Sequence, residues 1–141
     1  MNQNIIIING PNLNLLGSRE PEIYGNQTFE EFYKILKVEY KNIALSYYQT
    51  NHEGNIIDKL HEVGFSYDAI ILNAGGYTHT SIAIADAIKG ITTPVAEVHI
   101  SDIYAREKYR HHSYIKPMAV ISIVGKGLKG YKEAINYFQN Y

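Results

Sequence analysis

The chain has 141 residues, of which 45% are hydrophobic and 19% charged, a balance typical of one globular domain over residues 1–141 and not of a disordered segment. Thirteen lysines and arginines nearly balance fourteen aspartates and glutamates, so the net charge of −1 predicts neither a nucleic-acid partner nor attraction to an anionic membrane. The absence of cysteine excludes disulfides, thiolate nucleophiles and cysteine-based zinc sites, and no apolar run reaches the roughly 18 residues of a membrane span. We therefore expect a cytoplasmic globular protein.

In chain order, apolar runs alternate with helical patterns. The apolar runs predict strands at residues 4–9, 44–49, 69–73, 95–100 and 119–124. The segments between them predict helices that begin at Thr28 and then cover 53–63, 81–89 and 129–139, with a short helical turn near 103–109. Thr28 and Glu31 form a capping-box pattern at the start of the first of these helices.

This alternation predicts an α/β protein, namely a flavodoxin-like, doubly wound, five-stranded parallel sheet in a three-layer α/β/α arrangement. In such sheets, ligands bind beyond the carboxyl ends of the strands, where the winding reverses between the first and third strands. The residues that follow strands one, three and four are therefore the first candidates for a functional site.

The segment after the first strand, Gly10–Gly25, is longer than the about two to six residues that usually connect a strand to a helix. Its glycines and prolines mark turns and the hinges of a lid. It also carries Arg19, and the only other arginines in the chain are at positions 106 and 110. An Ω-loop with a surface arginine and one more tyrosine is the alternative interpretation.

The segment after the third strand, Asn73–Ser81, reads NAGGYTHTS. An asparagine ends a buried strand, two glycines free the backbone, and hydroxyl-bearing residues precede a helix, whose N-terminus can bind anions through its exposed N–H groups. Capping by Thr78 or Thr80 with an exposed His79 is the alternative, but it explains neither Asn73 nor the paired glycines.

The segment after the fourth strand contains Glu97, His99, Arg106 and Arg110. Glu97 and His99 share one face of the strand, because side chains alternate with a period of two, so the glutamate can orient the histidine or tune its charge. The two arginines share a face if their segment is helical. A structural pair with two solvated arginines is the alternative, and the rarity of ionisable groups in buried strands favours a functional pair.

Other patterns are weaker. His111 and His112 are adjacent and have no carboxylate at metal-ligand spacing. The run Gly125-Lys126-Gly127 lacks the spacing of a phosphate-binding loop. Lys59 and Lys89 occupy ordinary helical positions, so neither is predicted to form an imine.

Three long motifs stand in order at the ends of the predicted strands: GPNLNLLGSREPEIYG, NAGGYTHTS and EVHISDIYAREKYRHHSYI. Through them, and through essentially its whole length, the sequence resembles the type II 3-dehydroquinate dehydratases. It departs from that pattern at Ala74, Gly76 and Asp102, where Pro, Ala and Asn are expected. The resemblance implies a shikimate-pathway enzyme that converts 3-dehydroquinate to 3-dehydroshikimate and water, by anti elimination through an enolate, without a cofactor, a metal or an imine.

The catalytic residues that the resemblance implies are Tyr24, Arg19, His99, Glu97 and Asn12, with Arg106 in support. Tyr24 would be the base, and because a tyrosine has a reference pKa of about 10, the Arg19 cation would have to lower it. His99 would be the general acid that protonates the leaving hydroxyl, with Glu97 holding its orientation. Asn12 would position a water that stabilises the enolate oxygen.

The resemblance also implies which residues bind the hydroxyls and the carboxylate of the substrate: Asn73, His79, the Ile100 backbone, Ser101 and Arg110. Arg110 suits the carboxylate because its guanidinium can donate two parallel hydrogen bonds.

The helix that begins at Ser81 is apolar on every side, and a chain of this size has no second partner to cover it, so a neighbouring subunit is the natural cover. Asp86 is the lone charge within Ser81–Ile88, and an aspartate facing water along a narrow stripe is the alternative. The resemblance favours assembly, since it implies a homododecamer, a tetramer of trimers, in which Asp86 reaches a neighbour's active site.

Two functions of other classes compete with this interpretation. A flavodoxin-like ligand-binding domain, either a phospho-receiver or an FMN-binding module, would need an acidic cluster or a phosphate loop after the first strand, and a receiver also needs an aspartate at the end of the third. This chain has Asn9 and Asn73 at those strand ends. A catalytically inactive scaffold would be expected to lose Tyr24, Arg19 or His99, and all three are present.

Overall fold

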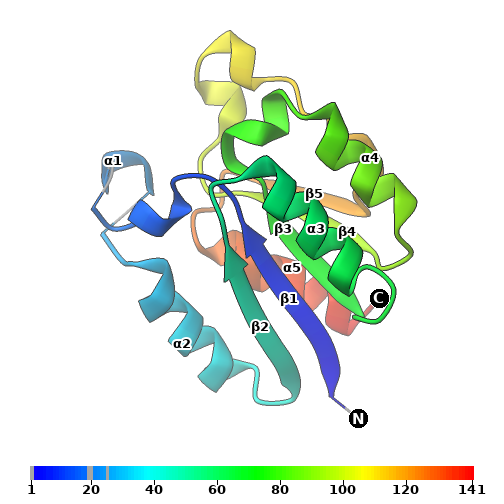
Figure 1. The fold of residues 1–141 in the computed structure, drawn as a ribbon. Coiled ribbons are helices and arrows are strands. Elements are labelled where there is room, and N and C mark those ends of the chain that lie inside the picture. The colour runs from blue at the N-terminus through cyan, green and yellow to red at the C-terminus, as the bar shows by residue number, and fades with distance from the viewer. Residues whose placement is uncertain (1, 19–20, 25) are drawn as a thin grey trace.

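The computed structural model describes residues 2–18, 21–24 and 26–141 and contains one five-stranded sheet (Figure 1). The strands are β1 (Gln3–Asn9), β2 (Ile43–Gln49), β3 (Ala69–Asn73), β4 (Val95–His99) and β5 (Ile121–Val124). They are parallel and lie in the order β2-β1-β3-β4-β5, which confirms the predicted flavodoxin-like sheet. The winding therefore reverses between β1 and β3.

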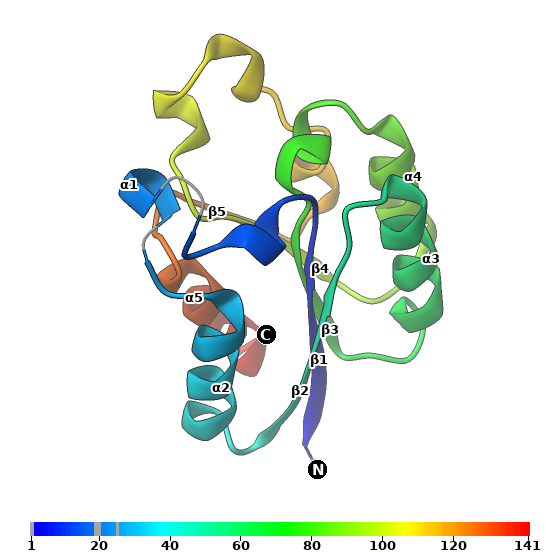
Figure 2. The same ribbon diagram turned by 60° about the vertical axis from the view of Figure 1, so that its left-hand side comes forward.

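Helices cover both faces of this sheet, as Figure 2 shows. The first face packs against α2 (Phe29–Glu39) and α5 (Lys129–Gln139), and the second against α3 (Glu53–Val63) and α4 (Ile82–Gly90). The predicted three-layer α/β/α arrangement is confirmed. A further short helix, α1 (Pro21–Tyr24), lies in the long segment after β1, for which the sequence predicts no helix.

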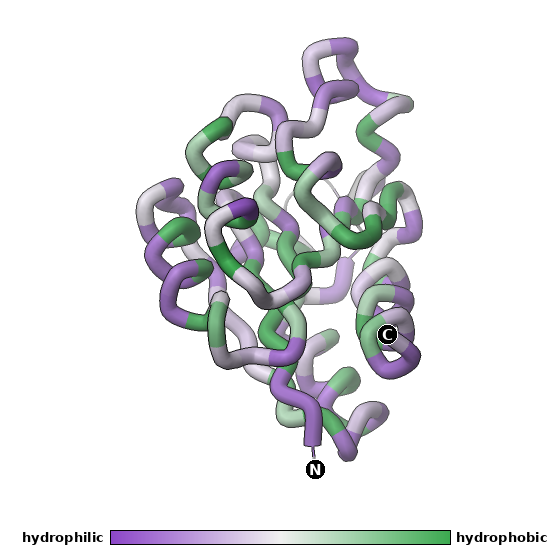
Figure 3. The backbone as a smooth tube through the Cα atoms, turned by 90° about the vertical axis from the view of Figure 1, so that its right-hand side faces the viewer, coloured by the Kyte–Doolittle hydropathy of each residue, from purple (hydrophilic) through white to green (hydrophobic). Residues whose placement is uncertain are grey.

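Alternation of apolar side chains along the strands supplies a core to each face. Ile5 and Ile7 of β1 pack with the α2 and α5 side, whereas Ile6 and Ile8 pack with the α3 and α4 side. All four are buried, as expected for a strand with neighbours on both sides and helices on both faces. Figure 3 shows hydrophobic residues concentrated along the parts of the chain that face the middle of the molecule. Within residues 2–18, 21–24 and 26–141, no helix is long and apolar enough to cross a bilayer.

Thr28 caps α2, as its sequence pattern predicts. Thr28 Oγ1 accepts a hydrogen bond from the Glu31 backbone N–H at 3.2 Å and donates to Glu31 Oε1 at 2.9 Å. The Thr28 hydroxyl therefore satisfies one of the N–H groups that the first turn of a helix leaves unpaired, which explains why α2 begins at Phe29.

The segment between β4 and β5 differs from the sequence prediction. Instead of one helical turn it contains three short 3₁₀ helices, η3 (Ile103–Ala105), η4 (Lys108–Arg110) and η5 (Lys116–Met118). Arg106 and Arg110 consequently do not share the face of one helix. Two further 3₁₀ helices, η1 (Leu13–Leu15) and η2 (Gly75–His79), follow β1 and β3. The helices η1 to η4 lie beyond the carboxyl ends of the strands, whereas η5 precedes β5 and packs against α4. Figure 1 shows this arrangement.

Candidate active site

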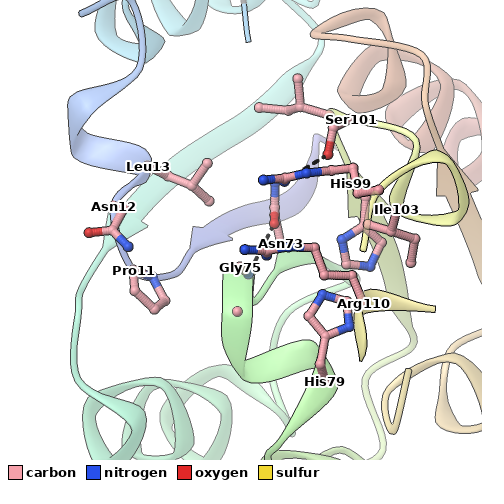
Figure 4. A pocket seen from close by; sticks show the side chains of 13 residues that line it. Pro11, Asn12, Leu13, Asn73, Gly75, His79, His99, Ser101, Ile103 and Arg110 are labelled. Carbon is pink, nitrogen blue, oxygen red and sulfur yellow. Dashed lines mark hydrogen bonds between the residues drawn. The ribbon is translucent and has the colours of Figure 1, made fainter. Parts of the chain in front are cut away.

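A cavity of about 160 Å³ lies at the carboxyl ends of β1, β3 and β4, beside the point where the winding reverses. Eight residues that the sequence singled out line it: Asn12, Asn73, His79, His99, Ile100, Ser101, Arg106 and Arg110. The rest of the described lining is Pro11, Leu13, Gly75, Gly76 and Ile103. The sequence pointed to the paired glycines as residues that free the backbone, but did not predict Pro11, Leu13 or Ile103 as site residues. Residues 11–13 lie on one side of the cavity and His79, His99 and Arg110 on the other (Figure 4).

Two glycines allow the segments after β1 and β3 to approach each other closely. A Cβ atom at Gly10 would lie 2.6 Å from the carbonyl oxygen of Ala74, and Gly75 has a φ of +59°. The Gly10 backbone N–H donates to the carbonyl oxygen of Asn73 at 2.7 Å. Gly10 and Gly75 thus allow the segments after β1 and β3 to meet at the edge of the cavity.

Asn12 has a left-handed backbone conformation, with a φ of 69°, which asparagine tolerates better than most residues. Its backbone N–H donates to Asn51 Oδ1 at 3.0 Å, and Gln49 Nε2 donates to the same oxygen at 3.2 Å. Gln49 also donates to the carbonyl oxygen of Gly10 at 3.2 Å. The end of β2 therefore holds the start of the loop in which Asn12 lies.

Asn73 is buried at the end of β3, and its amide is held from two sides. Its Nδ2 donates to Tyr131 Oη at 3.0 Å, and its Oδ1 accepts from the Gly75 N–H at 3.1 Å. Tyr131 Oη donates to Asn9 Oδ1 at 2.8 Å, and burial raises the pKa of Tyr131, so this hydroxyl keeps its proton. Because Tyr131 gives its one proton to Asn9, it must accept from Asn73, which fixes the orientation of the Asn73 amide.

Asn9 and Tyr131 were not predicted from the sequence as parts of this network. The available signal was a tyrosine on the apolar face of the last helix, whose hydroxyl must find a partner when it is buried.

Glu97 and His99 are buried side by side on β4, as predicted. His99 Nε2 lies 2.9 Å from Glu97 Oε2, and the carboxylate also accepts from Ser122 Oγ at 2.5 Å and from Ser113 Oγ. Burial works to raise the pKa of Glu97, but the hydrogen bonds from His99, Ser113 and Ser122 hold it below its ordinary value of 4.5. An ionised carboxylate can only accept, so His99 Nε2 carries a proton and Nδ1 is the ring nitrogen that remains for other partners.

His79 lies next to His99, with ring centroids 6.3 Å apart. Its Nδ1 is 2.8 Å from the carbonyl oxygen of His112, which can only accept, so Nδ1 is protonated. Burial is the main cause that lowers the pKa of His79; the electrostatic effects of His99 and Arg110 add to it, against the opposing effects of the His112 carbonyl and Glu97. A neutral His79 of this tautomer offers Nε2 as a hydrogen-bond acceptor.

Arg106 and Arg110 supply positive charge to the cavity from the segment between β4 and β5. Arg106 Nη1 donates to Ser101 Oγ at 3.4 Å, and Arg110 Nε donates to Glu107 Oε2 at 2.6 Å. Glu107 therefore holds the guanidinium of Arg110 through Nε. The two Nη groups of Arg110 point in other directions, because the five N–H donors of arginine have a fixed fork geometry.

The N-terminus of α4 is not part of the described cavity lining. Residues 75–79 make the 3₁₀ helix η2, and α4 begins later, after Ser81, whose Oγ accepts from the Ile84 N–H at 2.9 Å. Ser81 therefore caps α4 and pairs one N–H group of its first turn. In the part of the chain that the structure describes, η2 rather than α4 lines the cavity, through Gly75, Gly76 and His79.

The remaining sequence-predicted residues lie elsewhere. Arg19 is outside the described residues, and Tyr24 ends α1, with a side chain outside the described part of the structure. Glu97 lies behind His99 and does not line the cavity. Asp86 is exposed on α4, on the same side as Ile82, which is 57% exposed in the single chain.

Among the described residues, no group of three or more histidine, aspartate or glutamate side chains is placed to hold a metal ion. The cavity instead combines a histidine that is backed by a buried carboxylate, a neutral histidine, two asparagines and two arginines. These groups suit a small anionic molecule that carries several hydroxyls. The fold and the site define an α/β protein whose polar cavity, at the reversal of the winding, is equipped for acid–base chemistry.

Comparison with known proteins agrees with this class. A family model described as dehydroquinase class II matches residues 3–139. A catabolic 3-dehydroquinase 2 of Neosartorya fischeri is 50% identical, over 94% of this chain and 90% of the relative, and a 3-dehydroquinate dehydratase of Trichodesmium erythraeum is 49% identical, over 97% and 95%. The crystal structure of a type II dehydroquinase from Butyrivibrio crossotus superposes with a TM-score of 0.94 at 46% identity, over 98% of each chain. The chain belongs to the class II dehydroquinase family.

Membership of this family favours an enzyme over the flavodoxin-like ligand-binding alternative. The structure gives a physical reason in the same direction. Asn9 and Asn73, at the strand ends where a phospho-receiver would need acidic groups, are both bonded to Tyr131.

Proposed function

We propose that this chain is a 3-dehydroquinate dehydratase of the shikimate pathway, which removes water from 3-dehydroquinate to give 3-dehydroshikimate. The observation that carries the proposal is the buried Glu97–His99 pair at the carboxyl end of β4. The chain is also about half identical to enzymes of that name over nearly its whole length.

The reaction needs a base and an acid on opposite sides of the bond that becomes unsaturated, because the elimination is anti. The base removes a proton from carbon 2, next to the ketone, and an enolate forms. We assign this step to Tyr24, with Arg19 lowering the pKa of its hydroxyl and Arg106 adding to the positive charge. Asn12, at the cavity wall, would hold a water against the enolate oxygen.

His99 would then protonate the hydroxyl that leaves carbon 1. With Nε2 bonded to Glu97, the imidazolium form carries its second proton on Nδ1, and this proton would go to the leaving oxygen. Glu97 would act through His99 by holding the ring in one orientation, as the carboxylate does in other carboxylate–histidine pairs.

The substrate's polar groups match the cavity. Arg110 would bind the carboxylate with the guanidinium nitrogens that Glu107 leaves open. His79 would accept a hydrogen bond from a substrate hydroxyl through Nε2. Ser101, the Ile100 backbone and the second N–H of the Asn73 amide would bind the remaining hydroxyls.

We further propose that residues 1–141 act as one domain that assembles as a homododecamer, a tetramer of trimers, with Asp86 contributing to a neighbour's site. The exposed Ile82 and Ala83 beside Asp86 on α4 support this proposal, because they leave part of an apolar helix uncovered in the single chain.

The test is an ultraviolet assay with purified protein and 3-dehydroquinate. The product contains a double bond conjugated to the ketone, so we expect absorbance to rise with time in proportion to enzyme. A His99→Asn variant should lose most of this activity, and a His61→Asn variant, altered on the exposed face of α3, should retain it. A wild-type protein that gives no conjugated product would contradict the proposed function.

A further inference from the structure

Two serines that the proposed mechanism does not use meet the Glu97 carboxylate. Ser122 lies on β5 directly beside Glu97, since the two residues are paired in the register of β4 and β5, and its Oγ is 2.5 Å from Oε1. Ser113 lies between η4 and η5, and its Oγ bonds to Oε2, the oxygen that also meets His99. Two serines from outside β4 thus contact a carboxylate that is only 1% exposed.

The hydrogen bonds of Ser113 leave its hydroxyl one role. Its Oγ accepts from the backbone N–H of Ile115 at 3.2 Å and from that of Lys116 at 3.0 Å. A serine hydroxyl has two acceptor positions and one proton. Both acceptor positions are occupied, so the single proton of Ser113 points at Glu97.

Glu97 therefore receives three donors, one from each serine and one from His99, and each favours the ionised form. The titratable group in contact with Glu97 is His99, and His79 is the next one along the cavity wall. With Oε1 held by Ser122 and Oε2 by Ser113, the carboxylate cannot rotate away from the His99 ring without losing two charge-assisted hydrogen bonds.

We propose that Ser113 and Ser122 are positioning residues: they hold the Glu97 carboxylate ionised and in the one rotamer that fixes the tautomer and orientation of His99. The inference rests on the proposed function only for its effect on turnover. Ser113 also connects the segment that carries Arg106 and Arg110 to β4. Glu97 therefore contacts both the proposed acid His99 and the segment that carries the two arginines.

The test compares Ser122→Ala, Ser122→Thr and Ser113→Ala in the full chain. Ser122→Thr keeps the hydroxyl in a residue suited to a strand, whereas the alanine variants remove it. Ser46→Ala is the matched control, because it removes another partly buried strand serine, whose hydroxyl has no partner among the described residues and lies on β2.

The first readout is the pH titration of the Glu97 carboxyl carbon by NMR, assigned through its loss in Glu97→Gln. We expect the midpoint to rise by about one to two pH units in Ser122→Ala and in Ser113→Ala, because each loses a hydrogen bond to a charged group. Ser122→Thr and Ser46→Ala should titrate as wild type. The imidazole nitrogen shifts of His99 should report the Nε2–H tautomer in wild type and a mixture in the alanine variants.

The second readout is turnover of 3-dehydroquinate, where both alanine variants should lose about tenfold in kcat with KM within about twofold. Unchanged Glu97 midpoints and an unchanged His99 tautomer in both alanine variants would overturn the positioning role. Ser122→Ala keeps the proposal testable if Ser113→Ala does not fold, since the hydroxyl of Ser122 bonds to Glu97 alone among the described residues. A wild-type protein without dehydratase activity would contradict the proposed function and would leave the NMR test of these serines intact.

Discussion

Tyr131 lies at the centre of the buried polar chain beneath the cavity, between Asn9 and Asn73. Its ring packs edge-on against Phe29, with centroids 5.0 Å apart, so the same side chain contributes to the apolar core between the sheet and the helices α2 and α5. A substitution that removes only the hydroxyl therefore measures how much the polar network stabilises the fold, while the packing of the ring is kept.

We expect Tyr131→Phe to lower the free energy of unfolding by about 1–3 kcal/mol, because Asn9 Oδ1 and Asn73 Nδ2 would remain buried without their partner. Urea unfolding followed by circular dichroism measures the loss. Tyr137→Phe on the same helix is the control, since the Tyr137 side chain is only partly buried. Equal losses in the two variants would show that the hydroxyl network does not stabilise the fold.

The lowered pKa of Glu97 also predicts how the free energy of unfolding depends on pH. Its pKa is lowered in the folded protein, so its contribution is complete above the ordinary value of 4.5 and is lost as the pH falls below it. We expect the difference in unfolding free energy between wild type and Glu97→Gln to shrink from pH 6 to pH 3, at ~1.4 kcal/mol for each unit of pKa lowering. A difference that is constant over this range would contradict the ionised state assigned to Glu97.

The elements that the sequence predicted well are those whose structure is determined by residues close together in the chain. The isoleucine run of β1 and the capping box of α2 each specify their structure within a few residues, and β1 and α2 lie where expected. The segments that it predicted less well depend on distant partners. The Tyr114 N–H donates to the carbonyl oxygen of Thr78, and His79 donates to that of His112, so η2 and the segment after η4 support each other on the same side of the cavity.

The capping box offers a test at the same scale. Thr28→Ala should destabilise the protein by about 1 kcal/mol, because the Glu31 N–H loses its acceptor, whereas Thr28→Ser keeps the hydroxyl and should cost less. Thermal unfolding of the two variants measures this difference. Equal melting temperatures for Thr28→Ala and wild type would mean that the cap contributes nothing to α2.

At the scale of the whole molecule, the strand order explains why three separate segments converge. Parallel strands end at the same edge, and the order β2-β1-β3-β4-β5 places the ends of β1, β3 and β4 side by side. The sequence predicted this convergence and eight residues of the cavity lining. It could not identify Asn9, Tyr131, Ser113 and Ser122, because ordinary residues acquire their roles only when distant elements meet.

The proposed assembly is tested at this scale. Sedimentation equilibrium should show a dodecamer, and Asp86→Ala should weaken substrate binding or turnover by about tenfold or more if Asp86 reaches a neighbouring subunit's site. Asp58→Ala, an exposed aspartate on α3, is the matched control and should leave both unchanged. A fully active monomer would contradict the assembly, and an Asp86→Ala enzyme identical to wild type would contradict the shared site.

The central claim is that Tyr24 removes the proton from 3-dehydroquinate, and kcat of Tyr24→Phe tests it most directly. The substitution removes only the proton acceptor, so we expect kcat to fall by ~10²–10⁴ while substrate affinity stays within a few fold. Tyr141→Phe, at an exposed tyrosine, should match wild type. A Tyr24→Phe enzyme that retains about a third of the wild-type kcat would remove Tyr24 from the mechanism.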